Sequence, residues 1–201
     1  MNFISLECSS KLPSVSVFLN DKHICREQII ESTSSALPLY IDEILKKNSI
    51  SINDMDYIAT TIGPGTFTGI RVGLSFSQGL AYSLKIPITP INTIEVLNNQ
   101  VKIDKEYIVG MHSHKDFIIC KYFNKINKNS IKLEKIGNLK NHTIFGVGLD
   151  KFKNEFNYHP LELTSLEIGK YSIKKYQQLV ENNISSIKPI YLNEYKTIAK
   201  I

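Results

Sequence analysis

The sequence of 201 residues predicts an α/β fold in which hairpins come first and crossover units follow. Three observations support this prediction. Residues 2–8, 14–19 and 23–30 alternate with turn residues in the manner of two successive hairpins. Residues 57–62 are apolar nearly throughout, as in a strand that is covered on both faces. A glycine-rich turn follows that strand, and residues 70–84 then show helical periodicity.

A helix is expected between the third and the fourth strand. Residues 32–35 are all serine or threonine and supply several candidates for its N-cap. Lys46 and Lys47 fall in its last turn, where cations complement the helix dipole. Its apolar positions recur at the spacing of one helix face: Leu37, Ile41, Ile44 and Leu45.

The rest of the first hundred residues completes the pattern βββαβαβα. Residues 86–91 contain two prolines, which predicts a short strand near a sheet edge. Residues 93–101 are expected to form a helix. The strand, the glycine-rich turn and the two helices therefore form crossover units of the kind that place strands in parallel.

The second half begins with strands again and resembles a reduced copy of the first. We expect strands at 107–111, 117–123, 130–136 and 143–148, and helices at 150–156 and 164–179. A boundary near residues 102–106 divides the chain into two predicted lobes. The first spans residues 1–103 and carries the glycine-rich turn, and the second spans residues 104–201.

Composition excludes several classes of protein. The apolar fraction of 42% supports a folded core. No apolar run approaches the length of about 20 residues that spans a bilayer, and the N-terminus does not resemble a signal peptide, so a cytoplasmic location without membrane contact is expected. Three widely spaced cysteines form neither a disulfide framework nor a zinc pattern. The net charge of +5 comes from scattered lysines, which favours a solvated surface over an RNA-binding face.

The segment at 63–73, GPGTFTGIRVG, is the most informative in the chain. Pro64 and Gly65 suit the central positions of a type II turn, and Thr66 or Thr68 can cap a helix that begins near Ile70. A strand that leads into a glycine-rich turn and a helix N-terminus can also bind phosphate. The candidate phosphate or nucleotide contacts are Gly63, Gly65, Thr66, Thr68 and Gly69.

The helix after the turn carries small residues on one stripe. Gly69, Gly73 and Ser77 lie four residues apart, and each internal glycine costs about 1 kcal/mol relative to alanine. Close approach of another backbone would explain them, either the protein's own sheet and first helix or a partner chain. Arg71, in the first turn of this helix, is expected to form an intramolecular ion pair or to bind a carboxylate or phosphate.

Other candidate sites carry weaker signals. His112 and His114 follow a strand and could share a metal with Asp116, although a surface turn explains the same pattern. Glu7 ends the first strand, where it could orient a phosphate-bound metal or simply be solvated. The spacing matches neither a Walker A loop nor a dinucleotide fingerprint, and no catalytic triad can be assigned. We therefore assign no catalytic residue and no metal site.

The chain resembles the TsaB (YeaZ) family, bacterial proteins of tRNA threonylcarbamoyladenosine (t6A) synthesis. The residues at 63–73 are close to that family's GPGSFTGxRxG signature, and the similarity continues through residues 79–81, Pro87 and Thr93. Leu37-Pro38, residues 146–148 and residues 189–192 also match. The resemblance covers essentially the whole chain.

The resemblance implies a two-lobed fold of the actin/sugar-kinase/Hsp70 (ribonuclease H-like) type with a reduced second lobe. It also implies a non-catalytic paralogue of TsaD that dimerises with TsaD and supports threonylcarbamoyl transfer to adenosine 37 of ANN-decoding tRNAs. TsaE joins the assembly, tRNA is contacted through TsaD, and ATP or ADP is expected, if anywhere, at the subunit interface. The implied interface uses both helices: Leu37, Tyr40, Ile41, Ile44, Gly69, Arg71, Gly73 and Ser77.

Two departures from the family pattern bear on function. Glu7 stands where the family usually has aspartate, and His112-Ser113-His114 stands where Asp-x-Arg is common. Both make independent ATP hydrolysis less expected. Two alternatives stay open at this point. One is a stand-alone nucleotide- or metal-dependent enzyme of the same superfold with Glu7, His112, His114 and Asp116 as ligands. The other is a scaffold that forms a homodimer through its exposed helices.

Overall fold

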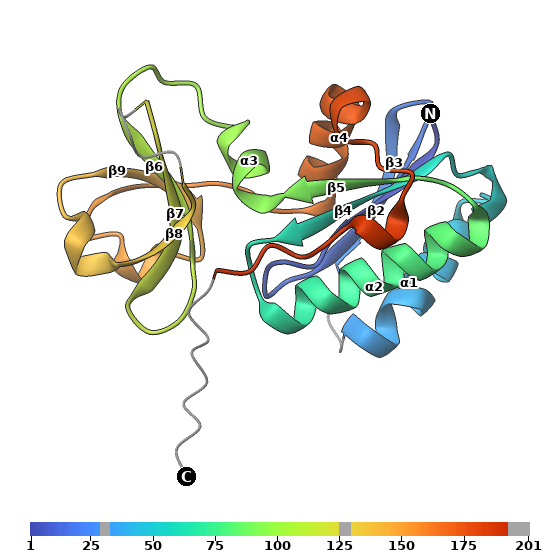
Figure 1. Ribbon diagram of the computed structural model, residues 1–201, viewed down its shortest axis with the longest axis horizontal. Coiled ribbons are helices and arrows are strands. Elements are labelled where there is room, and N and C mark those ends of the chain that lie inside the picture. Colours follow the sequence, from blue (N-terminus) through green and yellow to red (C-terminus); the bar gives the residue numbers. More distant parts are fainter. Residues whose placement is uncertain (29–32, 125–129, 193–201) are drawn as a thin grey trace, which may run out of the picture.

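The computed structural model describes residues 1–28, 33–124 and 130–192. Two five-stranded sheets lie side by side, and the long helices gather around the first of them (Figure 1). The α/β class is therefore confirmed. The predicted end of the third strand and part of the predicted N-cap segment fall on residues 29–32, outside the described residues.

The first sheet has the strand order β3-β2-β1-β4-β5. The strands β1, β2 and β3 form an antiparallel meander, and β4 and β5 add in parallel to β1. The expected hairpins and crossover units are thus confirmed, and β5 lies at an edge as its prolines predict. The strands are β1 (Phe3–Glu7), β2 (Ser14–Leu19), β3 (Lys22–Gln28), β4 (Tyr57–Gly63) and β5 (Ile88–Asn92).

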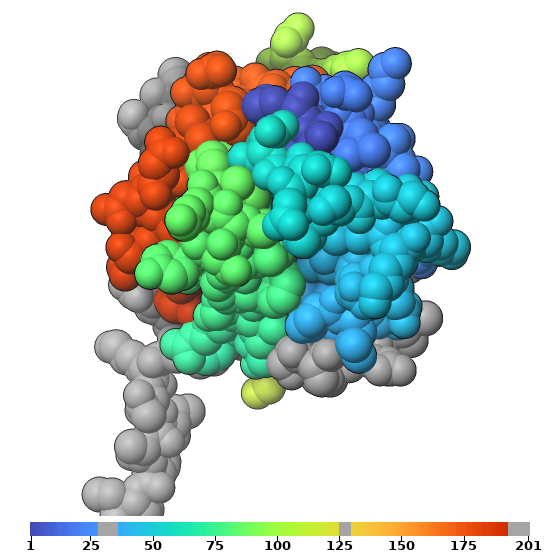
Figure 2. Space-filling model, turned by 90° about the vertical axis from the view of Figure 1, so that its right-hand side faces the viewer, coloured from blue at the N-terminus to red at the C-terminus, as the bar shows by residue number. Residues whose placement is uncertain are grey.

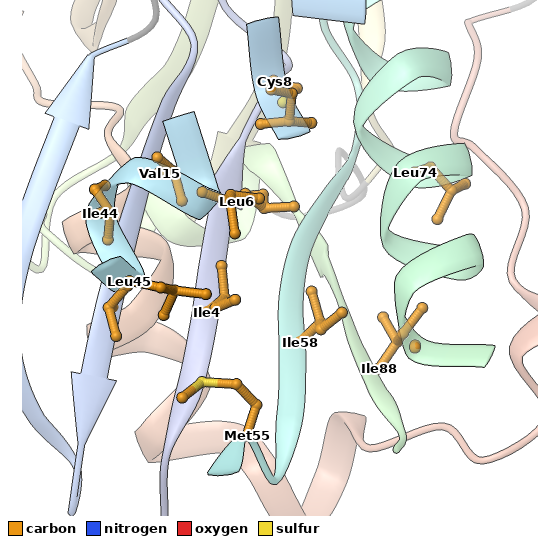
Figure 3. Close-up of a cluster of buried hydrophobic side chains, with 14 of the residues drawn as sticks. Ile4, Leu6, Cys8, Val15, Ile44, Leu45, Met55, Ile58, Leu74 and Ile88 are labelled. Carbon is orange, nitrogen blue, oxygen red and sulfur yellow. The ribbon is translucent and has the colours of Figure 1, made fainter. Parts of the chain in front are cut away.

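Helices cover both faces of this sheet. On one face lie α1 (Thr33–Lys47) and α2 (Phe67–Leu84), and on the other lies α4 (Ser165–Leu179) (Figure 1). Every residue of β1 is buried as a result. Figure 3 shows the apolar cluster under α1 and α2, where Ile4 and Leu6 of β1 share one core with Ile44 of α1 and Leu74 of α2.

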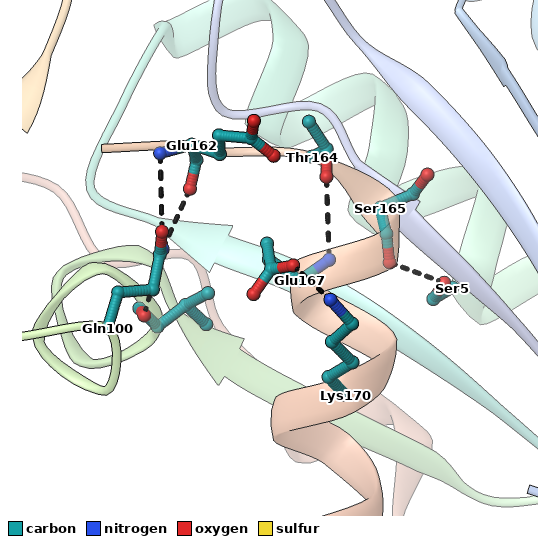
Figure 4. A network of polar contacts seen from close by, with 8 residues as sticks. Ser5, Gln100, Glu162, Thr164, Ser165, Glu167 and Lys170 are labelled. Atoms are coloured by element: carbon teal, nitrogen blue, oxygen red, sulfur yellow. Dashed lines mark hydrogen bonds and ion pairs between the residues drawn. The ribbon is translucent and has the colours of Figure 1, made fainter. Parts of the chain in front are cut away.

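Buried hydroxyl groups anchor the start of α4 on the sheet. Ser165 donates its N–H to Ser14 Oγ at 2.9 Å and shares a hydrogen bond with Ser16 Oγ at 2.7 Å. Its carbonyl oxygen accepts from Ser5 Oγ at 2.7 Å (Figure 4). Since buried polar groups are costly unless they are paired, these contacts fix where α4 sits on β1 and β2.

The second sheet repeats the topology of the first. Its order is β10-β9-β6-β7-β8, with β6, β7 and β8 in an antiparallel meander and β9 and β10 added in parallel. The expectation of a reduced copy is confirmed at the level of strand order. The strands are β6 (Tyr107–His112), β7 (Phe117–Phe123), β8 (Lys132–Lys135), β9 (Thr143–Val147) and β10 (Asn157–Pro160).

The second copy is reduced because its connections lack long helices. A single 3₁₀ turn, Ile136–Leu139, joins β8 to β9, and another, Asp150–Phe152, joins β9 to β10. The helix expected at 150–156 is therefore wrong, and β10 was not expected. Helix α3 (Thr93–Asn98) is shorter than the predicted 93–101.

The change from one sheet to the other falls between α3 and β6, close to the boundary near residues 102–106. The division into lobes 1–103 and 104–201 stays a prediction, because α4 belongs to the second stretch of sequence but packs on β1, β2, β4 and β5. The residues after α4 also return to the first sheet, where Ile190 donates its N–H to the carbonyl oxygen of Ile62 at 2.7 Å.

Candidate functional site

The glycine-rich turn connects β4 to α2, but its geometry differs from a type II turn centred on Pro64 and Gly65. Gly63 has a φ of +103°, whereas Gly65 is not among the residues with positive φ. The peptide bond between Gly63 and Pro64 is cis. Helix α2 begins at Phe67 rather than near Ile70, with Thr66 at the N-cap. The Thr66 hydroxyl donates to the carbonyl oxygen of Cys8 at 3.4 Å instead of capping the helix.

The small-residue stripe of α2 packs against Cys8, the residue that follows the protein's own first strand. A methyl group added at Gly69 would lie 2.1 Å from Cys8 O, and one added at Gly73 would lie 2.6 Å from Cys8 Cβ. Ser77 is fully buried and donates its hydroxyl to the carbonyl oxygen of Gly73. Of the two explanations for the stripe, the structure supports the intramolecular one. The assignment of Gly73 and Ser77 to a partner interface is therefore wrong, because their own chain already covers them.

The apolar residues of α1 that were expected at a partner interface also face inward. Leu37, Ile41 and Ile44 are buried in the core under α1 and α2, and Tyr40 is half-buried against it. The amphipathic spacing that selected these residues is the spacing of a core-facing stripe. Leu37, Ile41 and Ile44 are therefore wrong as direct partner contacts, because their own chain covers them. Tyr40 is the exception, since part of its side chain is accessible.

Three large apolar side chains on the two helices are instead exposed, and the sequence analysis did not select them. Leu39 is 62% exposed, Tyr82 82% and Phe67 39%. Leu39 lies two positions after Leu37, so it faces away from the core stripe. The sequence signal that could have identified them is the presence of leucine and aromatic residues at helix positions outside the core stripe. Figure 2 shows the face on which α2, in green, lies accessible between blue-to-cyan residues on one side and orange-to-red C-terminal residues on the other.

Arg71 makes aromatic contacts rather than the expected ion pair within the described residues, and its binding of an external carboxylate or phosphate stays a prediction. Its guanidinium lies 3.8 Å from the centre of the Phe67 ring, and its Nε donates to the Tyr191 hydroxyl at 2.7 Å. The Phe67 and Tyr191 rings also contact each other, with centroids 5.2 Å apart. The arginine therefore ties the start of α2 to the C-terminal segment through aromatic contacts.

The glycine-rich turn also forms one wall of a cleft between the two sheets. The cleft has a volume of about 610 Å³, and its opposite wall comes from the ends of β6 and β9. Of the candidate phosphate contacts, Gly65 and Thr66 line this cleft. Thr66 N–H already donates to the carbonyl oxygen of Ser9 at 2.7 Å, so it is not free to bind phosphate. Thr68 is exposed on the first turn of α2.

The remaining two candidate phosphate contacts are packed against the protein itself. A methyl group added at Gly63 would lie 2.8 Å from Ile190 O, and Gly69 lies against Cys8 as described above. Both glycines therefore serve close backbone packing, and so does Gly65, where an added methyl group would lie 2.2 Å from Ser9 O. Nucleotide binding at this turn stays a prediction.

Glu7 is completely buried, so neither a cleft ligand nor a solvated strand end describes it. Its carboxylate accepts hydrogen bonds from the N–H and the hydroxyl of both Ser9 and Ser10. Burial raises the pKa of Glu7, and the hydrogen bonds from Ser10 and Ser9 oppose that shift. The side chain thus holds the turn between β1 and β2 in shape.

The two histidines line the cleft, but they do not assemble a metal site with the other candidates. His112 Nε2 lies 3.0 Å from the carbonyl oxygen of Lys115, and the His114 ring stacks on Phe117. Asp116 is exposed in the same turn. Across residues 1–28, 33–124 and 130–192, no group of three His, Cys, Asp or Glu side chains is placed to hold a metal ion. The ligand set of Glu7, His112, His114 and Asp116 is therefore not brought together.

Comparisons with known proteins agree with the motif at residues 63–73. A family model described as TsaD, tRNA N6-adenosine threonylcarbamoyltransferase, matches residues 27–130. The tRNA threonylcarbamoyladenosine biosynthesis protein TsaB of Buchnera aphidicola subsp. Baizongia pistaciae is 30% identical over 218 residues, which cover 95% of this chain and 97% of that protein. The chain belongs to the TsaB (YeaZ) family. A TsaB of Haemophilus influenzae is 31% identical over 48% of the chain and 42% of its own length.

Solved structures of this family share the fold. YeaZ from Pseudomonas aeruginosa superposes with a TM-score of 0.73 at 14% identity, covering 95% of this chain and 99% of that one. A second Pseudomonas aeruginosa structure, described as similar to peptidase YEAZ, gives a TM-score of 0.75 at 16% identity with the same coverage. The two-lobed fold with a reduced second lobe, expected from the TsaB resemblance, is thus confirmed. Among the described residues, no helix is both long and apolar enough to cross a bilayer.

Proposed function

We propose that this TsaB-family chain is a non-catalytic subunit that pairs with TsaD and supports threonylcarbamoyl transfer to adenosine 37 of ANN-decoding tRNAs. The proposal rests on the relatives named for t6A biosynthesis and on one observation in the structure. That observation is the exposure of Leu39, Phe67 and Tyr82 on the α1–α2 side of the first sheet. Large apolar side chains exposed on two neighbouring helices fit a protein interface.

The chemistry of the cleft supports a role without catalysis by this chain. The carboxylate of Glu7, at the end of β1, accepts hydrogen bonds from Ser9 and Ser10. His112 and His114 form no three-residue metal-binding group within the described ranges. The ligand set proposed for a stand-alone enzyme is thus not assembled among these residues. The participation of TsaE, contact with tRNA through TsaD, a nucleotide at the shared interface and a homodimer of the isolated chain stay predictions of the family resemblance.

Depletion and complementation test this proposal. Loss of the protein should lower t6A in bulk tRNA, measured by liquid chromatography and mass spectrometry, and the wild-type gene should restore it. A Leu39→Asp, Tyr82→Asp variant should fail to restore t6A and fail to co-purify with TsaD. Ile24→Asp is a control for an aspartate placed at an exposed apolar position outside α1 and α2, because Ile24 is 42% exposed on β3. Normal t6A after depletion would refute the assignment to this pathway.

A further inference from the structure

A small pocket lies where the glycine-rich turn, the turn between β6 and β7 and the C-terminal segment meet. Its volume is about 140 Å³, and it adjoins the larger cleft, with which it shares Phe67 and His114. In Figure 1 the end of the C-terminal segment, in red, reaches the second sheet, so the pocket has a wall from each lobe. Five of the residues that line it carry rings: Pro64, Phe67, His114, Phe117 and Tyr191.

The aromatic rings form two contacting pairs, one on each wall. Phe67 and Tyr191 have centroids 5.2 Å apart, and so do His114 and Phe117. These rings are not sealed inside the fold, because Phe67 is 39% exposed and Tyr191 36%, while His114 is exposed and Phe117 half-buried. A pocket of this size between ring faces suits one planar ring system, since aromatic groups stack on one another.

A cation lies over a ring on each of the two walls. The Arg71 guanidinium carbon lies 3.8 Å from the centre of the Phe67 ring, and Lys135 Nζ lies 5.8 Å from the centre of the Phe117 ring. Within the part of the chain that the structure describes, none of the residues that line the pocket is acidic. The pocket therefore suits a ligand that carries both a planar ring and negative charge.

A nucleotide in an RNA strand has this combination. Unpaired bases stack on aromatic side chains, while basic side chains follow the phosphates of the strand. The two cations belong to different lobes, which suits phosphates on either side of one base better than the phosphate of a free nucleotide. At the rim, the Ser113 hydroxyl and the His114 imidazole supply hydrogen-bonding groups for the edge of a base. An aromatic side chain of another protein would use the rings but neither cation.

We propose that this pocket binds one unpaired base of an RNA strand, with the flanking phosphates near Arg71 and Lys135. The inference goes beyond the proposed function, in which tRNA is contacted through TsaD, because it places an RNA contact on this chain itself. All the residues that form the pocket come from this chain, so the contact does not depend on pairing with TsaD.

Fluorescence anisotropy with the full chain and two labelled RNAs tests the pocket. One RNA is a hairpin with an unpaired loop, and the other is the same stem as a closed duplex. Wild type should bind the hairpin at least fivefold more tightly than the duplex. Phe117→Leu, which removes the ring but keeps an apolar side chain, should weaken hairpin binding at least fivefold. Lys135→Glu should do the same and lower the slope of log affinity against log salt by about 0.7.

A second cation and ring in the same lobe provide matched controls. Lys151 Nζ lies 4.7 Å from the centre of the Phe152 ring, and neither residue lines the pocket. Phe152→Leu and Lys151→Glu make the same chemical changes as the two pocket variants. Both controls should bind the hairpin within twofold of wild type, so a loss confined to the pocket variants is not a general effect of charge or of a lost ring.

Equal binding of hairpin and duplex, or hairpin binding by both pocket variants that matches wild type, would overturn the inference. So would adenosine monophosphate that binds wild type but not Phe117→Leu while the hairpin does not bind, because the pocket would then belong to a free nucleotide. Circular dichroism checks that each variant is folded, and Lys135→Glu, at an exposed position, keeps the test decisive if Phe117→Leu unfolds. Since RNA binding is measured without TsaD, it can fail while depletion still lowers t6A, and the proposed function then stands.

Discussion

Alanine at Gly79 is expected to stabilise the isolated protein, whereas alanine at Gly73, six residues earlier on the same helix, is expected to destabilise it. At Gly79 the new methyl group meets nothing within 4 Å, so the variant gains only helix propensity, about 1 kcal/mol. At Gly73 the methyl group would lie 2.6 Å from Cys8 Cβ. Overpacking of this kind costs about 1–3 kcal/mol, from which the same propensity gain is subtracted.

The two variants should therefore differ by about 1–3 kcal/mol, and the propensity gain cancels in that difference. For a chain of this size, 1 kcal/mol shifts the melting temperature by about 2–4 °C. Thermal melting and urea denaturation of the two variants and wild type measure the effect. If Gly73→Ala is stabilised as much as Gly79→Ala, the close packing of α2 on Cys8 does not explain the glycines of this helix.

Three further predictions concern the parts of the fold that frame the site. Since burial raises the pKa of Glu7 above 4.5, wild type should lose stability relative to Glu7→Gln as the pH rises above 4.5, and urea denaturation at several pH values should show this. Tyr191→Ala should lower the free energy of unfolding by about 1–2 kcal/mol through loss of its contacts with Arg71 and Phe67. Ser165→Ala should cost about 1 kcal/mol, because the buried Ser16 hydroxyl loses its partner. An unchanged melting temperature of Tyr191→Ala or Ser165→Ala would contradict the contact assigned to that residue.

The strand, turn and helix between residues 57 and 84 are predictable because their signals are local. Apolar residues define β4, the cluster of glycine and proline interrupts it, and periodicity defines α2. The position of the N-cap is harder to predict from the sequence, since it depends on a contact between Thr66 and Cys8, which are far apart along the chain. Strand β10 gives almost no signal, because it is short, polar and largely exposed at the edge of the second sheet.

Residues for the proposed partner contact cannot be chosen from periodicity alone. An apolar stripe or a stripe of small residues shows that something packs closely, but not whether the contact is intramolecular. Cys8 lies 65 positions before Gly73, so their contact depends on how β1 and α2 come together in the fold. The better signal lies in exceptions to the pattern, such as Leu39 outside the core stripe of α1 and Gly79 outside the glycine stripe of α2.

The two copies of the sheet differ in the helices that connect their strands. In the first sheet, α1 connects β3 to β4 and α2 connects β4 to β5, so both crossovers place a long helix on one face. In the second sheet the equivalent connections are single 3₁₀ turns. A helix can present a row of side chains and a groove beside it, whereas a 3₁₀ turn cannot. Because the described part of the second lobe keeps the strands and lacks these crossover helices, the proposed helix-to-helix contact is expected on the first lobe, at α1 and α2.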